Sequence, residues 1–189
     1  AIYLISDEPY REIAYNGVKV PNIISHYDNS IIAYSYSKSM SIPGERIGYV
    51  LANPLAQEVD KLVDGFVFCN RILGFVNAPA LLQRVIATTG KTQVDVKEYQ
   101  RKRDMLCDGL ADIGYKFTKP EGAFYLFPKT PIIDDVKFVG LLQTKRILTV
   151  PGSGFGAHSC FRIAYCVDDE TISNSMKGFG EAFRECKES

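Results

Sequence analysis

The chain has 189 residues, of which 46% are hydrophobic and 12% aromatic, so it can bury a sizeable core in one domain or one and a half. Its 22 Lys and Arg residues balance 22 Asp and Glu residues, and this balance argues against nucleic acid or an anionic membrane as a partner. No apolar run approaches the ~20 residues that a membrane-spanning helix needs.

The cysteines and histidines argue against a disulfide framework and a metal site. The cysteines are odd in number, widely spaced and without a CxxC pair; they are Cys69, Cys107, Cys160, Cys166 and Cys186. We therefore expect reduced thiols and a cytoplasmic protein. His26 and His158 each lack a second His or Cys at ligand spacing, so we expect no metal.

The first half of the sequence alternates short apolar strands with amphipathic helices, which is typical of an α/β layer. Residues 1–6 form a continuous apolar run of the kind found in a doubly buried parallel strand. Because this run begins without an initiator Met, we expect the chain to be part of a longer protein. Further strands are predicted at 30–34 and 46–52.

Two helices are predicted to follow the third strand. Asn53 and Pro54 resemble an N-cap and a first-turn proline. The apolar face of this helix would consist of Leu55, Val59, Leu62, Val63 and Phe66. A further helix is predicted near 78–89, with Gly90 as the residue that ends it.

The second half predicts a small α/β domain. The long helix near 92–114 has one buried stripe, namely Val96, Tyr99, Arg103, Leu106, Leu110 and Ile113. A strand near 122–127, a helix near 136–144 that begins with Asp134 and Asp135, and strands near 147–150 and 160–166 follow. Asp168 caps a final helix that points Ile172, Met176, Phe179 and Phe183 inward.

Chemistry-bearing residues follow the first predicted strand, in the run Asp7-Glu-Pro-Tyr10. Ligands of open α/β sheets bind beyond the carboxyl ends of the strands, so a carboxylate and a phenol at this point can face a bound molecule. Taken alone, Asp and Pro are also ordinary turn residues.

The second strand leads directly into Ser35-Tyr-Ser-Lys38, and Arg46 follows within Gly44-Glu-Arg-Ile-Gly-Tyr49. A lysine amine can condense with a carbonyl, and an arginine together with a serine hydroxyl can hold phosphate oxygens. The group suits an aldehyde that bears a phosphate, although a lone SxxK would indicate only a solvated basic loop.

These motifs, in this order, resemble the class I/II aminotransferases, which are fold-type I enzymes dependent on pyridoxal 5'-phosphate (PLP). The resemblance implies that Lys38 carries PLP as a Schiff base and is catalytic, that Asp7 pairs with the pyridine nitrogen, and that Tyr10 bonds the ring hydroxyl. It implies that Ser35 and Arg46 hold the phosphate, with Ser37 also among the cofactor-binding residues.

Two later segments resemble the same family. Pro120-Glu-Gly-Ala-Phe-Tyr-Leu-Phe-Pro128 is similar to its small-domain strand, and Gly122 would let the backbone approach the substrate. The run from Val150 to Ala164 is similar to its substrate-carboxylate segment, so Arg162 would bind the α-carboxylate. From the residues alone, 150–156 is also consistent with a flexible Gly-rich loop.

The resemblance implies an α/β fold in two parts. Residues 1–91 would be the C-terminal part of the large PLP-binding domain, and residues 92–189 the small C-terminal domain. The implied activity exchanges an amino group between an amino acid and a 2-oxo acid, in an enzyme of the aspartate/aromatic-type group that forms a homodimer.

Two alternatives keep the same motifs. One is a PLP-dependent lyase, similar to cystathionine β-lyase or to aminocyclopropane-carboxylate synthase, and the other is the ligand-sensing domain of a PLP-dependent transcription regulator. The family's N-terminal portion, which completes the cofactor site, has no counterpart in this sequence. We therefore expect the isolated chain to bind PLP weakly, to show no appreciable transamination, and to self-associate through an exposed sheet edge.

Overall fold

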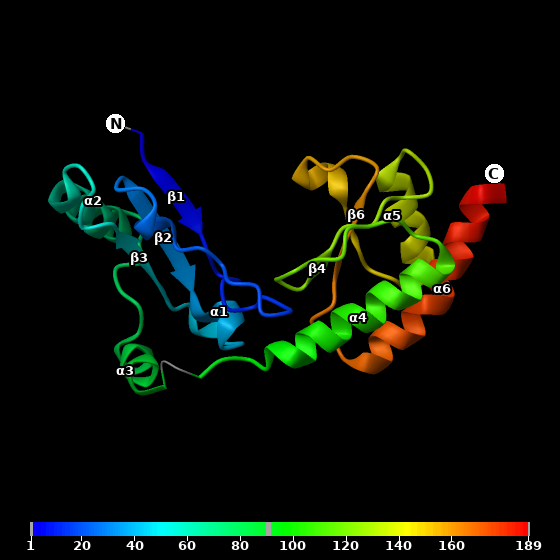
Figure 1. Ribbon diagram of the computed structural model, residues 1–189, viewed down its shortest axis with the longest axis horizontal. Helices are drawn as coiled ribbons and strands as arrows, with labels where there is room; N and C mark the ends of the chain where they lie inside the picture. The colour runs from blue at the N-terminus through cyan, green and yellow to red at the C-terminus, as the bar shows by residue number, and fades with distance from the viewer. Residues whose placement is uncertain (1, 90–91, 189) are drawn as a thin grey trace. The chain divides into compact units, whose positions relative to one another are not determined.

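A computed structural model describes residues 2–89 and 92–188 (Figure 1). The described residues form two compact units, one within 1–94 and one within 95–189. Each unit has its own sheet and its own helices, and the two are described separately below. The assignment of these units to a large and a small domain stays a prediction.

The first unit is built on a three-stranded sheet in the order β1-β2-β3, where β1 is Leu4–Asp7, β2 is Ser30–Ser35 and β3 is Gly48–Ala52. β1 runs parallel to β2, with Asp7 opposite Ala33, and β3 runs antiparallel to β2. Strands are therefore confirmed where the apolar runs predicted them. β3 begins later than predicted because Arg46 has a left-handed backbone with φ 51° and ends the 3-10 helix η2, Pro43–Glu45.

The expectation that the first strand is buried on both faces is wrong for the described chain. β1 lies at one edge of the sheet, and Ile5 is 67% exposed. The core of this unit lies against β2 instead, where Ile31, Ile32 and Tyr34 are buried together with Ile13 from the preceding loop. A run of apolar residues gives no information about which strands flank it, and this explains the difference.

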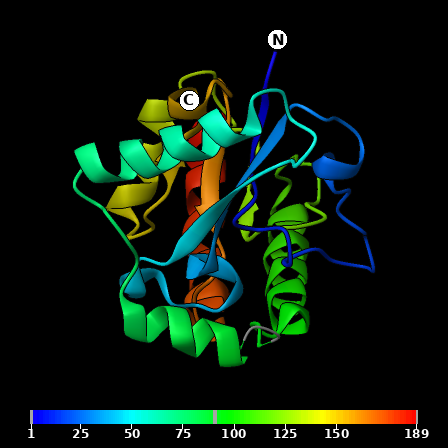
Figure 2. The ribbon, with the colours of Figure 1, turned by 90° about the vertical axis from the view of Figure 1, so that its left-hand side faces the viewer.

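The helices of the first unit are α1, Tyr36–Ser39, α2, Val59–Ile72, and α3, Ala80–Thr89, with the 3-10 helix η1 at Ile23–Ser25. Figure 2 views this unit from the front and shows α2 near one end of the sheet, with α1 and α3 near the other. No residue of α2 is fully buried. Of its predicted apolar face, Val59, Leu62 and Phe66 are half-buried, whereas Leu55 and Val63 are exposed. The predicted helix end at Gly90 lies outside the described residues.

Asn53 is not the N-cap of α2, which corrects the sequence-based prediction. The helix begins at Val59 with Glu58 as its N-cap. The side chain of Asn53 is buried, where its Nδ2 donates to the carbonyls of Ile24 at 3.0 Å and Tyr27 at 3.1 Å. Its Oδ1 accepts from the Leu55 amide and forms a local Asx turn, which resembles a helix cap in sequence. The Nδ2 contacts instead tie the end of β3 to the segment before β2.

The second unit packs two long helices and one shorter helix against a small antiparallel sheet of order β4-β6-β5 (Figure 1). The helices are α4 (Val96–Ile113), α5 (Asp135–Thr144) and α6 (Asp169–Glu188). The strands are β4 (Tyr125–Leu126), β5 (Val150–Pro151) and β6 (Phe161–Ala164), and the 3-10 helix η3 is Gly152–Phe155. These elements confirm the predicted order of the second half, although each strand is shorter than predicted.

Aromatic side chains fill the core of the second unit. The ring of Tyr115 lies within 6.2 Å of those of Phe138, Phe161, Phe179 and Phe183. Its hydroxyl donates to the Phe179 carbonyl at 3.1 Å, which satisfies the polar group that burial removes from water. This core fixes α6 and β6, and thereby the strand that carries Arg162.

Candidate functional site

Asp7 and Ser35 lie at the carboxyl ends of neighbouring parallel strands. Asp7 ends β1 and Ser35 ends β2, and the register that pairs Asp7 with Ala33 brings both ends to one edge of the sheet. Asp7 is exposed, and its carboxylate forms no hydrogen bond or ion pair with any described residue. It is therefore available to a ligand, as the position at the strand end predicts.

An ion pair that the sequence analysis did not single out holds the loop after β1. The Nη1 of Arg11 lies 2.6 Å from the Glu8 carboxylate, and Glu8 is buried. The same guanidinium donates to the carbonyls of Pro21 at 3.2 Å and Val20 at 3.1 Å. Arg11 therefore links Glu8, directly after β1, to Val20 and Pro21 further along the loop, and these contacts hold the turn that contains Tyr10.

Lys38 lies in α1, the short helix that follows β2 directly. Ser35 is its N-cap: the Ser35 Oγ accepts from the Ser37 amide at 3.2 Å and donates to the Ser37 Oγ at 2.8 Å. The Nζ of Lys38 lies 5.9 Å from the centroid of the Tyr10 ring. The fold therefore brings Lys38 and Tyr10 together although they come from different loops.

Tyr34 links α1 to the loop after β1. Its buried hydroxyl donates to the Glu12 carboxylate at 2.8 Å and is hydrogen-bonded to the Ser39 Oγ at 2.7 Å. Burial raises the pKa of this phenol well above its usual range, so the Tyr34 hydroxyl keeps its proton at neutral pH. No sequence signal pointed to this link, because an apolar strand position occupied by Tyr is ordinary.

Arg46 lies at the exposed end of η2, just before β3. Its Nη1 donates to the Pro43 carbonyl at 2.7 Å, and its other N–H groups form no hydrogen bond with a described residue. Gly48 opens β3 where it meets the end of β2, and a Cβ at this position would lie 2.3 Å from the Tyr34 carbonyl. Glycine at this position therefore allows β3 to approach the strand that leads into Lys38.

Arg162 and Gly122 belong to the second unit, and the structure does not place them relative to Lys38. Arg162 is half-buried on β6, with its guanidinium carbon 4.2 Å from the Phe155 ring centroid and 4.6 Å from that of Tyr125. Gly122 is half-buried and lies before β4. The roles of all the predicted site residues stay proposals.

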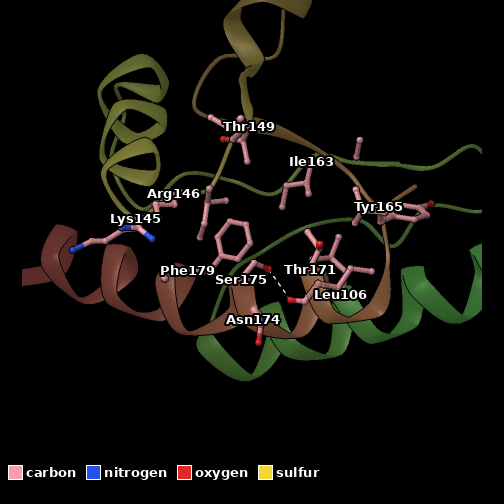
Figure 3. A pocket seen from close by; sticks show the side chains of 16 residues that line it. Leu106, Lys145, Arg146, Thr149, Ile163, Tyr165, Thr171, Asn174, Ser175 and Phe179 are labelled. Carbon is pink, nitrogen blue, oxygen red and sulfur yellow. Dashed lines mark hydrogen bonds between the residues drawn. The ribbon is translucent and has the colours of Figure 1, made fainter.

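The second unit also has a hollow of about 540 Å³ (Figure 3). It lies against α6, the segment 145–149 and the end of β6, and none of the predicted site residues lines it. Thr149 contributes a buried hydroxyl oxygen that has no hydrogen-bond partner among the described residues. The hollow therefore contains none of the predicted site residues, although Ile163 and Ala164, which follow Arg162 on β6, line it.

Two kinds of structural feature are absent from the part of the chain that the structure describes. Within 2–89 and 92–188, no helix has the length and hydropathy to cross a membrane. Over the same residues, no three His, Cys, Asp or Glu side chains are grouped so that they could bind a metal ion.

The described chain is an α/β protein whose first unit carries a candidate amine site around Lys38. Its second unit carries Arg162, a candidate anion-binding residue, on β6. The family model "Aminotransferase class I and II" matches residues 1–179, and the chain belongs to this family.

Curated and solved relatives agree with this membership. The chain is 29% identical to aspartate aminotransferase of Thermotoga maritima over 92% of this chain and 45% of that protein. It is 29% identical to LL-diaminopimelate aminotransferase 2 of Nostoc sp. over 96% of this chain and 48% of that protein. A crystal structure of an aminotransferase from Eubacterium rectale matches with a TM-score of 0.93 and 43% identity, covering 97% of this chain and 46% of that one. The chain therefore spans about half the length of the relatives it matches.

Proposed function

We propose that this chain supplies the Schiff-base lysine and the substrate arginine of a PLP-dependent aminotransferase. The observation that carries the proposal is the placement of Lys38 beside Tyr10, at the sheet edge where Asp7 and Ser35 end neighbouring parallel strands. The reaction would exchange an amino group between an amino acid and a 2-oxo acid. Membership of the aminotransferase family supports it.

The donor set at the strand ends fits the cofactor. Asp7 offers an exposed carboxylate to a protonated ring nitrogen, and Tyr10 offers a phenol to the ring hydroxyl. Arg46, with N–H groups that no described residue occupies, suits phosphate oxygens, and the Ser35 and Ser37 hydroxyls add polar partners. Bound PLP would supply an electron sink for charge that develops at the substrate Cα.

Within this proposal, the residues of the chain bind the substrate and move its proton. Arg162 binds the substrate carboxylate through the N–H groups of its guanidinium. With PLP held at the site, the Lys38 amine would act as the general base that takes the proton from the substrate Cα. Lys38 therefore has two roles, first as the anchor of the cofactor and then as the general base.

An aminotransferase is favoured over a PLP-dependent lyase because the relatives reported above are aminotransferases. The two reactions differ in the fate of nitrogen. With saturating amino acid and no 2-oxo acid, an aminotransferase retains the amino group on the cofactor and releases one equivalent of 2-oxo acid. A lyase similar to cystathionine β-lyase releases ammonia continuously, and one similar to aminocyclopropane-carboxylate synthase releases neither ammonia nor a 2-oxo acid. Assays of ammonia and of 2-oxo acid in the same reaction therefore separate these possibilities.

Lys38 can be tested directly in the longest natural polypeptide that contains this sequence, called the parent protein below. We expect borohydride reduction of the PLP-loaded parent, followed by peptide mass spectrometry, to place the pyridoxyl group on Lys38. Lys38→Ala should abolish this label and the visible absorption band of the bound cofactor. Lys61→Ala is the matched control, because Lys61 is exposed on α2 and pairs only with Glu58 among the described residues.

A pyridoxyl group on another lysine, or an unchanged absorption band in Lys38→Ala, would overturn the proposed function. The assembly and location of the parent belong to the same proposal. We propose a homodimer in the cytoplasm, and the dimer can be checked by light scattering of the purified parent.

A further inference from the structure

The guanidinium of Arg162 is held by two aromatic rings and by no polar partner that the structure describes. Its carbon lies over the rings of Tyr125 and Phe155, at 4.6 Å and 4.2 Å from their centroids. Within 2–89 and 92–188, no hydrogen bond or ion pair satisfies its N–H groups. We call Tyr125 and Phe155 the aromatic clamp.

Strand register places one side of the clamp. Tyr125 on β4 pairs with Ala164 on β6, so Arg162 is its diagonal neighbour two residues away. Side chains two residues apart in a strand share a face, and Tyr125 and Arg162 therefore point to the same side of the sheet. The contact follows from the antiparallel pairing and needs no unusual backbone.

The loop that carries Phe155 is fixed by several independent contacts. Asp135, buried at the start of α5, accepts from the Ser153 amide at 2.6 Å. Gly152 lies so close to the Ala157 carbonyl that a Cβ would be 2.3 Å from its oxygen. The Phe155 ring also packs edge-on against Phe127 at 5.8 Å. Phe155 is thus positioned before any ligand binds.

The clamp has a chemical consequence for Arg162. Aromatic rings attract the flat, weakly hydrated surface of a guanidinium, whereas its N–H groups lie around the rim of its plane. With rings over the cation, a ligand reaches it best at the rim, where two parallel N–H groups match the two oxygens of a carboxylate. The side chain also has little freedom left to lose when the carboxylate binds.

We propose that Phe155 and Tyr125 are positioning residues that hold the Arg162 guanidinium for edge-on binding of a planar carboxylate. The inference rests on the proposed function for the identity of that carboxylate, which would be the α-carboxylate of the amino acid substrate. Phe155 and Tyr125 act through Arg162 and bind no substrate atom in this proposal.

The test uses the 15N-labelled parent protein and the Nε–Hε signals of arginine in two-dimensional NMR. Arg162→Lys identifies the signal of Arg162 by its loss. Sodium acetate is the carboxylate probe, and acetamide, which has nearly the same shape and no charge, is the control ligand at constant ionic strength. The variants are Phe155→Leu, which removes the ring, and Phe155→Tyr, which keeps it.

We expect acetate to shift the Arg162 signal and acetamide to leave it in place. In Phe155→Leu, the dissociation constant for acetate should rise roughly 3- to 30-fold, and Phe155→Tyr should restore it. Phe155 is 49% exposed, so neither substitution should unfold the chain, and thermal unfolding of each variant checks this. Tyr125→Leu, compared with Tyr125→Phe, repeats the test at the second ring.

Equal acetate affinity in the wild type and Phe155→Leu would overturn the inference, and so would a wild type that does not discriminate acetate from acetamide. These outcomes are independent of PLP. A pyridoxyl label on Lys38 with no acetate response would leave the proposed function in place and remove the clamp. An acetate response that depends on Phe155, with no pyridoxyl label on Lys38, would support the aromatic clamp and overturn the proposed function.

Discussion

Asp135 illustrates how a single buried side chain supports the loop next to the candidate substrate arginine. It is the first residue of α5, after the N-cap Asp134, which accepts from the Lys137 amide at 2.9 Å. The hydrogen bond from the Ser153 backbone amide is the largest cause that holds the pKa of the Asp135 carboxyl below its usual range. The sequence predicted a helix start at this position, which is confirmed, but it did not indicate the contact with Ser153.

The lowered pKa predicts how acid affects the second unit. An aspartate with a lowered pKa adds stability above its unfolded pKa of about 3.9, and this stability is lost as pH falls through the lower pKa of the folded state. Asp135→Asn has no such charge to lose. We therefore expect the free energy of unfolding to fall less between about pH 6 and pH 2.5 in Asp135→Asn than in the wild type.

Urea unfolding at several pH values measures this difference. Asp112→Asn, at an exposed position of α4, is the control, and it should keep the acid sensitivity of the wild type. If Asp135→Asn lost as much stability in acid as the wild type does, the Ser153 contact would not be a source of stability.

At the scale of elements, the close approach of β3 to β2 positions the lysine helix. The register pairs Gly48 with Ser35, and Ser35 is the residue that caps α1. A side chain at Gly48 would collide with the backbone carbonyl of Tyr34, which has no flexible end to move aside. A displacement of the beginning of β3 would therefore also displace Ser35 and the start of α1.

We predict that Gly48→Ala lowers the free energy of unfolding by about 1–3 kcal/mol, because the strands must separate to admit the methyl group. Gly44→Ala is a matched control four positions earlier, since a Cβ there meets nothing within 4 Å. Its effect should stay within about 0.5 kcal/mol. Chemical denaturation of both variants provides the measurement, and equal effects would show that the β2–β3 contact is not tight in solution.

The elements also show which sequence signals can be misread. Asn53 has the residue type and the following proline of a helix N-cap, yet its side chain binds loop carbonyls that lie 26 and 29 positions earlier. Capping motifs report a local turn, and an Asx turn without a helix has the same local pattern. The start of a helix that follows such a turn is decided by packing at a distance.

At the scale of the whole molecule, the first unit has a large amount of exposed apolar surface. On α2 and the segment after it, the exposed side chains are Val63, Val67, Phe68, Ile72, Leu73, Phe75 and Val76; on the sheet they include Leu4, Ile5, Val50 and Leu51. Apolar patches of this kind mark surfaces that bind another surface or aggregate. The two outer strands, β1 and β3, also have edges that pair with no described strand.

We therefore predict that the isolated 189-residue chain self-associates, and that sedimentation velocity shows its apparent mass rising with concentration. The double substitution Phe68→Ser and Ile72→Ser should reduce this rise, because both side chains are more than 60% exposed on one face of α2, at 62% and 63%. Ile133→Ser is the control, since Ile133 is 88% exposed in the second unit. A mass that is constant for the wild type would contradict the prediction.

The sequence alone was sufficient for the family, and it predicted the motifs that contain Asp7, Tyr10, Ser35 and Lys38, whose roles stay proposals. These residues lie within short motifs, and each motif follows a strand whose apolar run can be recognised locally. Because parallel strands of a sheet place their carboxyl ends together, motifs that follow β1 and β2 predict one shared site without any knowledge of side-chain contacts. The order of strands and helices could be predicted for the same reason, since hydrophobic periodicity is local.

Only the tertiary structure revealed the contacts that hold those motifs in place. The link from Glu12 through Tyr34 to Ser39, the Glu8–Arg11 ion pair and the aromatic clamp on Arg162 join residues whose positions depend on loop paths and strand register. The exposure of β1 and the start of α2 were likewise decided by neighbours distant in the chain. Local periodicity determines which face of an element is apolar, but which partner meets that face depends on the three-dimensional packing of the whole chain.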